Sequence, residues 1–521
     1  MGSTNGQVIR CKGVMALNPN IELSRTVPHE PQQETSEDRQ IEIETDGGEN
    51  QRKGKPRPLE SQWMISINDI LAGAKLDNGA CSWAKRSIYR IPHYLKDGQT
   101  KACVPQIVSL GPYYHGDERL REKDKDKWRG LVCMLERKNQ KIEEYLDAVK
   151  QVEERARACY EGVITMSSEE FVMMMVLDGC FVIELFWGWS NGFDKLGYTQ
   201  DDPVFSELRS LMHLIQRDMI LLENQIPLFI LDLLFNLQCG QPNHDELLAK
   251  LALKFLHPLR PTECPFHCVG SKRLESNPLA NEDELQEWAV HCLVSFQPSL
   301  SRSSTKRAVH CLELFRRSLL CLGPRWAATL ELSQIGQPVI NCVTELRKKG
   351  IKFKKGEVGA FWNIQFKDGT LEFPWLKIEE TTLSLFLNLI AFEQCHFDCD
   401  NDVTSYLFFM DKLINSAKDV EHLHDCGIMD HWLGSDAEAA NLFNQLCKEV
   451  VLVEDVSYLS KLSKDVNTYS GNKWNCWIAS LKLKYFSNPW SIISLIAAFI
   501  LLMLTLAQTF YGVYGYYMPR S

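Results

Sequence analysis

The C-terminal end of the chain carries an apolar run that limits how the chain can fold. Residues 490–507 read WSIISLIAAFILLMLTLA, and no charged side chain occurs from Tyr485 to Pro519. Eighteen residues in a helix extend about 27 Å, which is close to the thickness of the hydrocarbon core of a bilayer. Aromatic residues flank the run on both sides, as they do at membrane interfaces. The run therefore predicts a single membrane-spanning helix over 489–514, with the rest of the chain on one side of the membrane.

The charges beside this run favour a cytoplasmic body. Lys482 and Lys484 precede the run, and only Arg520 follows it, so the basic excess lies on the N-terminal side. The N-terminus has no apolar stretch of signal-peptide length, and the chain has no Asn-x-Ser/Thr glycosylation site. The net charge of −10 disfavours nucleic acid as a partner. We therefore expect an anchor in the plasma membrane, a body in the cytoplasm and contact with lipid through the span.

The 18 cysteines do not form the framework of a small disulfide-rich protein. They are scattered singly along a chain that is long enough to bury a large core without disulfides. Cys133, Cys180, Cys292 and Cys447 lie in apolar helical contexts, where a thiol behaves as a small hydrophobic group. We expect reduced and mostly buried cysteines.

The rest of the sequence predicts a mainly α fold, with a multi-helix body, a small β-hairpin and the C-terminal membrane helix. Residues 1–60 are rich in charge, Gly and Pro and poor in apolar side chains, which is typical of a disordered leader. The body extends over 61–484. Helical periodicity of apolar residues covers 117–161, 167–187, 205–237 with a kink or division at Pro227, 245–256, 281–296, 305–322, 382–394, 403–415, 418–426 and 436–451.

The hairpin is predicted near residues 351–373. Apolar and polar residues alternate in Ile351–Lys354, and two further short stretches, Phe361–Phe366 and Thr370–Phe373, flank Asp368-Gly369. Alternation on both sides of an Asp-Gly pair is a strong signal for two antiparallel strands joined by a tight turn.

One motif in the sequence formally matches a hydrolase nucleophile. Gly188-Trp-Ser190-Asn-Gly192 has the G-x-S-x-G pattern, and the apolar segment before it has a composition that a strand also tolerates. A nucleophile elbow needs a helix directly after the serine, whereas the residues after Gly192 read as a loop. A pattern with two fixed glycines arises easily by chance, so we assign no catalytic residue.

Three clusters of Cys and His side chains raise the question of a metal site. They are Cys264-His267-Cys268, Cys395-His396-Cys399 and the looser group of His422, His424, Cys426 and His431. None has the regular C-x2-C spacing of a zinc knuckle. Loop thiols and surface imidazoles explain them more simply, so we assign no metal and no cofactor.

Four acidic residues embedded in apolar segments are more informative: Asp178, Glu184, Asp218 and Glu223. Asp178 and Glu184 are six residues apart, so they do not share one face of a helix. Buried carboxylates can perform acid–base chemistry when neighbours separate their pKa values. They can equally pair with Arg or Lys, or hold helix ends, in an ordinary core. Pairing is the favoured interpretation, although the sequence alone leaves both open.

Several basic runs offer a further surface. Arg302–Arg307, Arg316-Arg317 and Arg347–Lys349 suit contact with anionic lipid near the anchor. Solvated helix faces explain the same runs equally well.

Ordered motifs across residues 84–512 carry a family resemblance. They are Ile88–Pro92, Val104-Pro105, Val108–Gly116, Lys127-Trp128, Leu177–Phe186, Asp218–Pro227, Leu346–Phe353, Asn388–Gln394, Asn488–Trp490 and Gln508–Tyr511. Together they resemble the plant family known as domain of unknown function 247, also called the UPF0481 family. This chain has Tyr114 where the family more often has a His before His115, which weighs against a metal site at that pair.

The resemblance implies a mostly helical plant protein with a C-terminal span and no established catalytic residues. Some grass members look like pollen-side determinants of self-incompatibility, which would make the body a recognition module. Our leading hypothesis is a membrane-anchored recognition or signalling protein that acts through protein contacts without catalysis. The alternatives are an enzyme that uses the four buried carboxylates and a lipid-contacting scaffold.

Overall fold

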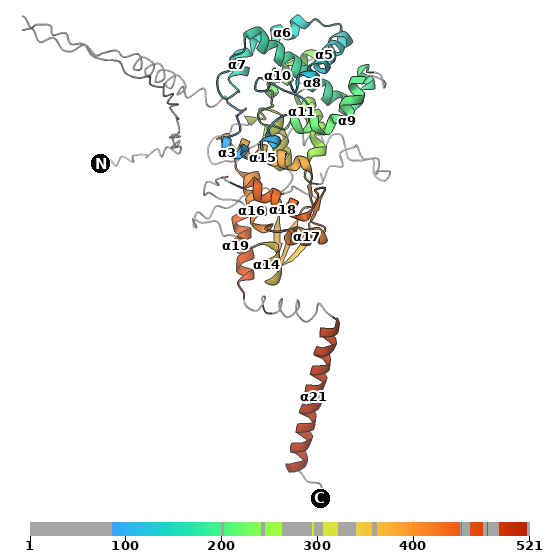
Figure 1. The fold of residues 1–521 in the computed structure, drawn as a ribbon, viewed down its shortest axis with the longest axis vertical. Coiled ribbons are helices and arrows are strands. Elements are labelled where there is room, and N and C mark those ends of the chain that lie inside the picture. Colours follow the sequence, from blue (N-terminus) through green and yellow to red (C-terminus); the bar gives the residue numbers. More distant parts are fainter. Residues whose placement is uncertain are drawn as a thin grey trace, which may run out of the picture. The chain divides into compact units, whose positions relative to one another are not determined.

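The computed structural model describes residues 86–198, 203–240, 245–262, 294–295, 306–320, 340–356, 362–397, 399–448, 450, 459–472, 477 and 489–517. The chain divides into two units, Met1–Leu71 and Ala72–Ser521, and all described residues belong to the second. The fold is mainly helical with small sheets, as the periodicity predicts (Figure 1). The predicted leader at 1–60 lies outside the described residues.

Helix α8 (Ser168–Asn191) is the central helix of the N-terminal half of the body. The side chain of Ser167 accepts a hydrogen bond from the backbone N–H of Glu170 at 3.1 Å, which confirms the predicted start of the helix. The helix is long and apolar enough to cross a membrane, but it is buried within the body. It packs against α5 (Asp124–Lys138), α10 (Leu228–Cys239) and α11 (Asp245–Leu256). It is therefore a core helix and not a second span.

Two predicted helical stretches are divided into shorter helices. The stretch 117–161 breaks after α5, where Asn139 has a left-handed backbone with φ 52°. The stretch 205–237 is divided as predicted: one helix ends at Asp218, and the next begins at Leu228, directly after Pro227. A proline fits just before a helix but not inside one, because it cannot donate a backbone hydrogen bond. The other helices of this half are α3 (His93–Lys96), α4 (Thr100–Cys103), η1 (Arg121–Lys123), α6 (Ile142–Gln151), α7 (Glu153–Arg157), η2 (Asp194–Leu196), α9 (Pro203–Asp218) and η3 (His257–Leu259).

The C-terminal half of the body continues the same hydrophobic core. After residue 380, the helices predicted over 382–394, 403–415, 418–426 and 436–451 form to within about five residues, whereas the helix at Leu459–Ser470 was not predicted. In Figure 1, α5 and α6 lie at the end of the body remote from α14 and α17. The helices are α13 (Cys311–Leu320), α14 (Val343–Lys348), α15 (Glu380–Cys395), α16 (Asp402–Leu413), α17 (Ala417–Asp425), α18 (Asp436–Leu446) and α19 (Leu459–Ser470).

The predicted hairpin forms and has a third strand. β4 (Gln365–Lys367) and β5 (Thr370–Phe373) are antiparallel. Asp368 and Gly369 between them have φ 50° and 74°, which suits a two-residue turn with positive φ at both positions. β3 (Lys352–Lys355) pairs with β5 in parallel, so the sheet order is β3-β5-β4.

Two smaller pairings were not predicted. β6 (Leu376–Ile378) pairs in parallel with β7 (Met429–His431). β1 (Val294–Ser295) pairs with β2 (Lys306–Arg307) in antiparallel orientation. The helix predicted over 281–296 is wrong at Val294–Ser295, and its other residues lie outside the described ranges. The helix predicted over 305–322 begins only at Cys311, because β2 precedes it.

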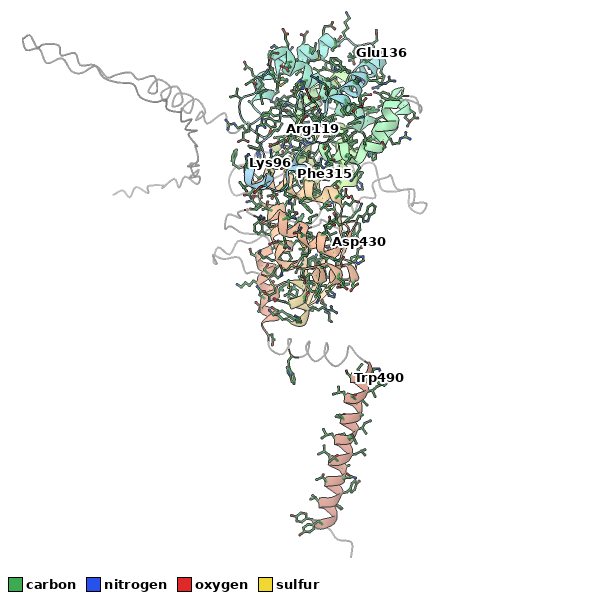
Figure 2. All side chains as sticks on the ribbon, in the orientation of Figure 1. Lys96, Arg119, Glu136, Phe315, Asp430 and Trp490 are labelled. Carbon is green, nitrogen blue, oxygen red and sulfur yellow. The ribbon has the colours of Figure 1, made fainter. Side chains whose placement is uncertain are left out.

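The C-terminal helix α21 (Pro489–Tyr517) covers the predicted span, and Trp490 lies in its first turn (Figure 2). Residues 490–517 are long and apolar enough to cross a membrane, and no part of their apolar window is buried in the body. The hydroxyls of Ser494, Thr505 and Thr509 donate to the carbonyl four residues earlier. Such bonds satisfy polar groups inside the helix, which suits an apolar solvent.

Candidate functional site

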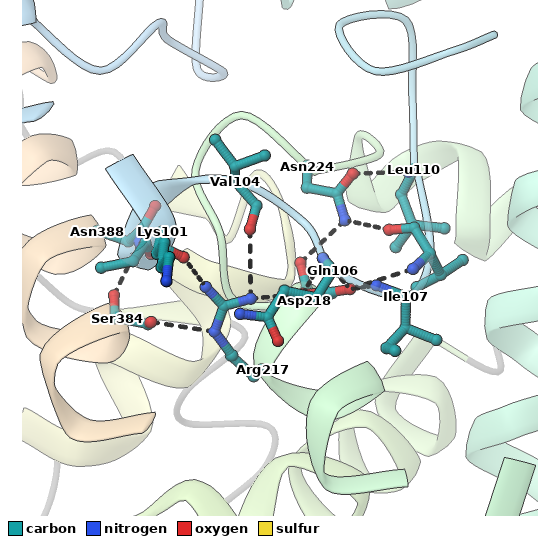
Figure 3. Close-up of polar contacts among 12 residues, drawn as sticks. Lys101, Val104, Gln106, Ile107, Leu110, Arg217, Asp218, Asn224, Ser384 and Asn388 are labelled. Atoms are coloured by element: carbon teal, nitrogen blue, oxygen red, sulfur yellow. Dashed lines mark hydrogen bonds and ion pairs between the residues drawn. The ribbon is translucent and has the colours of Figure 1, made fainter. Parts of the chain in front are cut away.

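A cluster of buried polar side chains surrounds the segment Val104–Gly111, which connects α4 to the rest of the body without regular secondary structure (Figure 3). Asp218, the last residue of α9, is fully buried. Its carboxylate accepts the backbone N–H groups of Gln106, Ile107 and Val108 at 2.6–3.1 Å. Three N–H groups without a strand partner are thus satisfied by one side chain.

Arg217 neutralises this carboxylate and ties it to α15. Its guanidinium lies 2.8 Å from Asp218 and also donates to the hydroxyl of Ser384 and to the carbonyls of Lys101 and Val104. Burial raises the pKa of Asp218, and the N–H donors and Arg217 act against this rise. The group therefore works as a structural anchor with every lone pair directed at a donor.

Two asparagines complete the connection between the same segments. Asn224 accepts the N–H of Leu110 at 2.7 Å and donates to the carbonyls of Val108 and Asp218. Asn388 of α15 accepts the N–H of Leu222 at 2.8 Å and donates to Ala102 and Ser384 carbonyls. Each amide replaces the backbone partner that a neighbouring strand would supply.

Asp178 of α8 anchors the end of the segment. It lies 2.7 Å from the ammonium group of Lys127, accepts the N–H of Gly111 at 2.9 Å, and is 2% exposed, as is the lysine. Lys127 also donates to the carbonyl of Ser109 at 2.7 Å. Burial raises the pKa of Asp178, and Lys127 opposes that rise. The pair is a buried ion pair that spans α5, α8 and the Val104–Gly111 segment.

Glu184 and Glu223 occupy separate surroundings. Glu184 receives two parallel hydrogen bonds of 2.8 Å from Arg137 and a third from Tyr198, an arrangement that suits guanidinium and carboxylate geometry. Glu223 accepts from Lys96 at 2.6 Å and from the N–H of Ile91 at 2.7 Å. The four acidic residues are not gathered around one point: each is neutralised by its own Lys or Arg.

Tyr114 belongs to the surroundings of Glu223. Its hydroxyl donates to the Glu223 carboxylate at 2.6 Å, and burial together with that carboxylate raises the pKa of Tyr114. The neighbouring His115 faces a different residue, Glu170, at 3.7 Å. The departure from the family motif at position 114 thus has a structural role in this chain.

Sequence reasoning missed other buried carboxylates, among them Glu393 of α15. Arg316 of α13 donates to it at 2.6 Å, and Thr404 donates to it through both its N–H and its hydroxyl. Arg316 is therefore buried, and Arg317 pairs with Glu313 at 2.6 Å. The interpretation of Arg316-Arg317 as a lipid-contacting run is wrong for these two residues. The apolar residues of α13 on both sides of Arg316 could have indicated that this arginine is buried.

The serine of the G-x-S-x-G motif does not lie at an elbow. Ser190 is in the last turn of α8, and Gly188 lies against the ring of Phe193, leaving no room for a side chain. A nucleophile elbow requires a strand before the serine and a helix after it. The segment before Ser190 is helical, so the motif match is accidental.

The Cys and His clusters separate into individual contacts. His396 stacks on Phe392 with ring centroids 5.0 Å apart and hydrogen bonds to the hydroxyl of Tyr89 at 2.9 Å. His431 lies 2.7 Å from Asp436. Within the described ranges no three His, Cys, Asp or Glu residues gather in a metal-binding arrangement. The cluster at Cys264–Cys268 lies outside those ranges.

The described cysteines form no disulfide. Burial raises the pKa of the thiols of Cys103, Cys311 and Cys395 to about 12. Because the thiolate is the reactive form, these side chains are poor nucleophiles at neutral pH. Cys180 is buried as predicted, Cys133 and Cys447 are half-buried, and Cys292 lies outside the described residues.

The comparisons with known proteins agree with the motifs. Residues 88–504 match the family described as a plant protein of unknown function, DUF247. The chain is 29% identical to the UPF0481 protein At3g47200 of Arabidopsis thaliana, over 82% of this chain and 86% of that protein. It is 25% identical to a second UPF0481 protein of that plant, At3g02645, over 88% of this chain and 96% of that protein. No solved structure matches the chain. The chain belongs to the plant DUF247 family of proteins of unknown function.

Proposed function

We propose that this protein is a membrane-anchored recognition or signalling protein that acts through contacts with other proteins and not through catalysis. The observation that carries the proposal is how the buried acidic groups are used. Asp178, Glu184, Asp218 and Glu223 each have a basic partner within 2.8 Å. Acid–base catalysis instead needs titratable groups with separated pKa values around one substrate position. The length and apolar character of α21 support anchoring.

The exposed aromatic side chains support a protein partner. Tyr94 of α3 is 44% exposed and Phe397, just after α15, is 68% exposed. Both lie at the C-terminal end of α15: burial and the nearby thiol of Cys395, the last residue of α15, raise the pKa of Tyr94, and Phe397 lies beside His396 with ring centroids 6.0 Å apart. Aromatic residues are enriched at protein interfaces, where they supply large contact area. We define Tyr94 and Phe397 as the aromatic patch and propose it as a contact surface.

The test is capture of partners by the full chain in native plant membranes, with cross-linking before solubilisation. We expect a defined set of proteins with the wild type and loss of that set with Tyr94→Ala/Phe397→Ala. The matched control is Trp128→Ala/Val132→Ala, which removes a pair on α5 that is 44% and 49% exposed. Equal capture by both variants would refute the patch. Capture of no specific protein by the folded wild type would refute the function.

We further propose that the body faces the cytoplasm and that α21 resides in the plasma membrane. Lys482 and Lys484 support this orientation, since basic residues beside a span remain on the cytoplasmic side. Protease treatment of intact cells that carry an N-terminal tag tests it. The tag should survive until the plasma membrane is permeabilised, and digestion in intact cells would reverse the orientation.

A role in self-incompatibility is one specific form of recognition, suggested by the resemblance to grass members. Loss of the gene in pollen should then allow self-pollination in an otherwise incompatible cross. Unchanged rejection of the mutant pollen would exclude this role while leaving the broader recognition function intact.

A further inference from the structure

The three-stranded sheet β3-β5-β4 has one exposed face that is basic. Its register places Lys352, Thr370 and Lys367 in one row across the three strands. Lys354 belongs to the same face, because side chains two residues apart along a strand point the same way. All three lysines are exposed. We call Lys352, Lys354 and Lys367 the basic sheet face.

The described strands of this sheet and their turn contain two acidic side chains, Asp368 and Glu372. Glu372 is 3.2 Å from Lys354, and Asp368 is exposed at the turn. The preceding helix α14 adds exposed Arg347 and Lys348 at its C-terminal end and one exposed acidic residue, Glu345. The whole chain carries a net charge of −10, so this local basic excess runs against the overall charge.

The opposite face of the same sheet packs against α19. Phe366 of β4 meets Tyr469 of α19 edge to face, with ring centroids 5.7 Å apart. A side chain at Gly369 would collide with the same tyrosine. α19 therefore packs on the apolar side of the sheet at β4, and His422 of α17 meets Phe353 of β3 on the same side, whereas the three lysines on the other side are exposed. Residues 471–488 then connect α19 to α21.

The length of this connection limits how far the sheet can be from the membrane. Eighteen residues reach at most about 60 Å when fully extended. The connection contains Lys473, Lys482 and Lys484 and no acidic residue. A surface tethered so closely to a membrane has a high effective concentration beside it.

We propose that the basic sheet face contacts anionic lipid head groups of the membrane that α21 crosses. This inference rests on the proposed anchoring and cytoplasmic orientation, because the cytoplasmic leaflet is the anionic one. Lysine ammonium groups bind phosphate as compact point charges that tolerate many head-group geometries. The tether favours lipid over an acidic protein, which would have to be recruited from solution.

The experiment uses the full chain in lipid nanodiscs and measures the acetylation rate of each lysine by mass spectrometry. One set of discs contains phosphatidylcholine alone, and the other contains about 30% phosphatidylglycerol, which supplies negative charge without a competing amine. We expect the basic sheet face to react at least about threefold more slowly in the anionic discs. Raising NaCl to about 0.5 M should remove the difference by screening. The internal controls are Lys138 and Lys141, which are exposed around the end of α5 and should not change.

Three outcomes would overturn the inference. Equal rates in both kinds of disc would show that the face does not meet the lipid. Equal protection by soluble phosphate in neutral discs would indicate an anion site independent of the membrane. Protection only in native membranes that contain other proteins would indicate an acidic protein partner.

Extraction with alkaline carbonate separates these failures from failure of the anchor. A chain that resists extraction but shows equal labelling refutes the lipid contact alone. A chain that is extracted refutes the proposed anchoring, and with it the basis of the inference.

Discussion

Replacing Asp178 with Asn should destabilise the protein strongly, although the change is nearly isosteric. The amide oxygen can still accept the N–H of Gly111, which lies 2.9 Å from the native carboxylate. The negative charge is lost, however, and the ammonium group of Lys127 stays buried at 2% exposure. Breaking a buried ion pair by removing one partner costs about 3–5 kcal/mol. Because the hydrogen bond to Gly111 is retained, we attribute this cost to the loss of the buried partner of Lys127, which keeps only the exposed carboxylate of Asp124 at 3.3 Å.

The assay is urea unfolding of the full-length protein in detergent, followed by tryptophan fluorescence at neutral pH. The midpoint should fall for Asp178→Asn while the slope stays constant, which identifies a change in stability. The matched control is Glu372→Gln, because the Lys354–Glu372 pair has side chains that are 68% and 37% exposed. Exposed pairs contribute under about 1 kcal/mol, so the control should move the midpoint little.

The double variant Lys127→Met/Asp178→Asn sharpens the test. It removes both charges, so it should cost clearly less than the sum of the two single changes. Equal midpoints for Asp178→Asn and Glu372→Gln, or strict additivity in the double variant, would refute the assignment of a coupled buried pair.

Three further predictions concern the same body. Gly111→Ala should lower the urea midpoint far more than Gly98→Ala. Both glycines have positive φ, but a Cβ at Gly111 would lie 2.7 Å from a backbone carbonyl oxygen, whereas one at Gly98 would meet nothing within 4 Å. Equal losses would contradict this steric reason. Burial lowers the pKa of His310 from 6.5 to about 4. The free energy of unfolding of the wild type should therefore fall by up to about 3 kcal/mol from this group as the pH drops from about 6.5 to about 4. His310→Gln should reduce that fall, and an unchanged dependence of the urea midpoint on pH would contradict the role of His310. Hydrogen bonds from Lys150, Ser168 and Arg157 hold the pKa of Glu153 at about 2, below its ordinary 4.5. The stabilisation that Glu153 provides is therefore present above pH 4.5 and lost toward pH 2. The difference in urea midpoint between wild type and Glu153→Gln should shrink over that interval, and a constant difference would disprove the linkage.

Local patterns predicted local structure well. The 3.6-residue period located α11 and α15–α18, and the Asp368-Gly369 pair located the hairpin, since both depend on neighbours in sequence. The spacing of Asp178 and Glu184 correctly indicated different helix faces. Their pairing with basic side chains was the favoured interpretation, and the structure confirms it.

The partners of these groups could not be read from the sequence. Lys127 is 51 residues from Asp178, and many other lysines were equally available. The parallel pairing of β6 with β7 joins segments about 50 residues apart, and no local period encodes it. The conformation of segment 104–111 could not be predicted either, because it is held by side chains of residues distant in sequence and has no period of its own. Arg316 was misread since its charge suggested solvent, whereas its carboxylate partner follows 77 residues later.

The side chains that anchor Val104–Gly111 also determine when this segment can fold during synthesis of the chain. The N–H of Ile107 finds its acceptor in Asp218, 111 residues later, and the carbonyl of Ala102 meets Asn388 only 286 residues later. Contacts at such separations close slowly, because a long loop must be ordered first. A nascent chain that ends before α15 therefore holds this segment with only part of its network. The N-terminal half can complete its polar core only when most of the body has left the ribosome, which places final folding shortly before α21 is made.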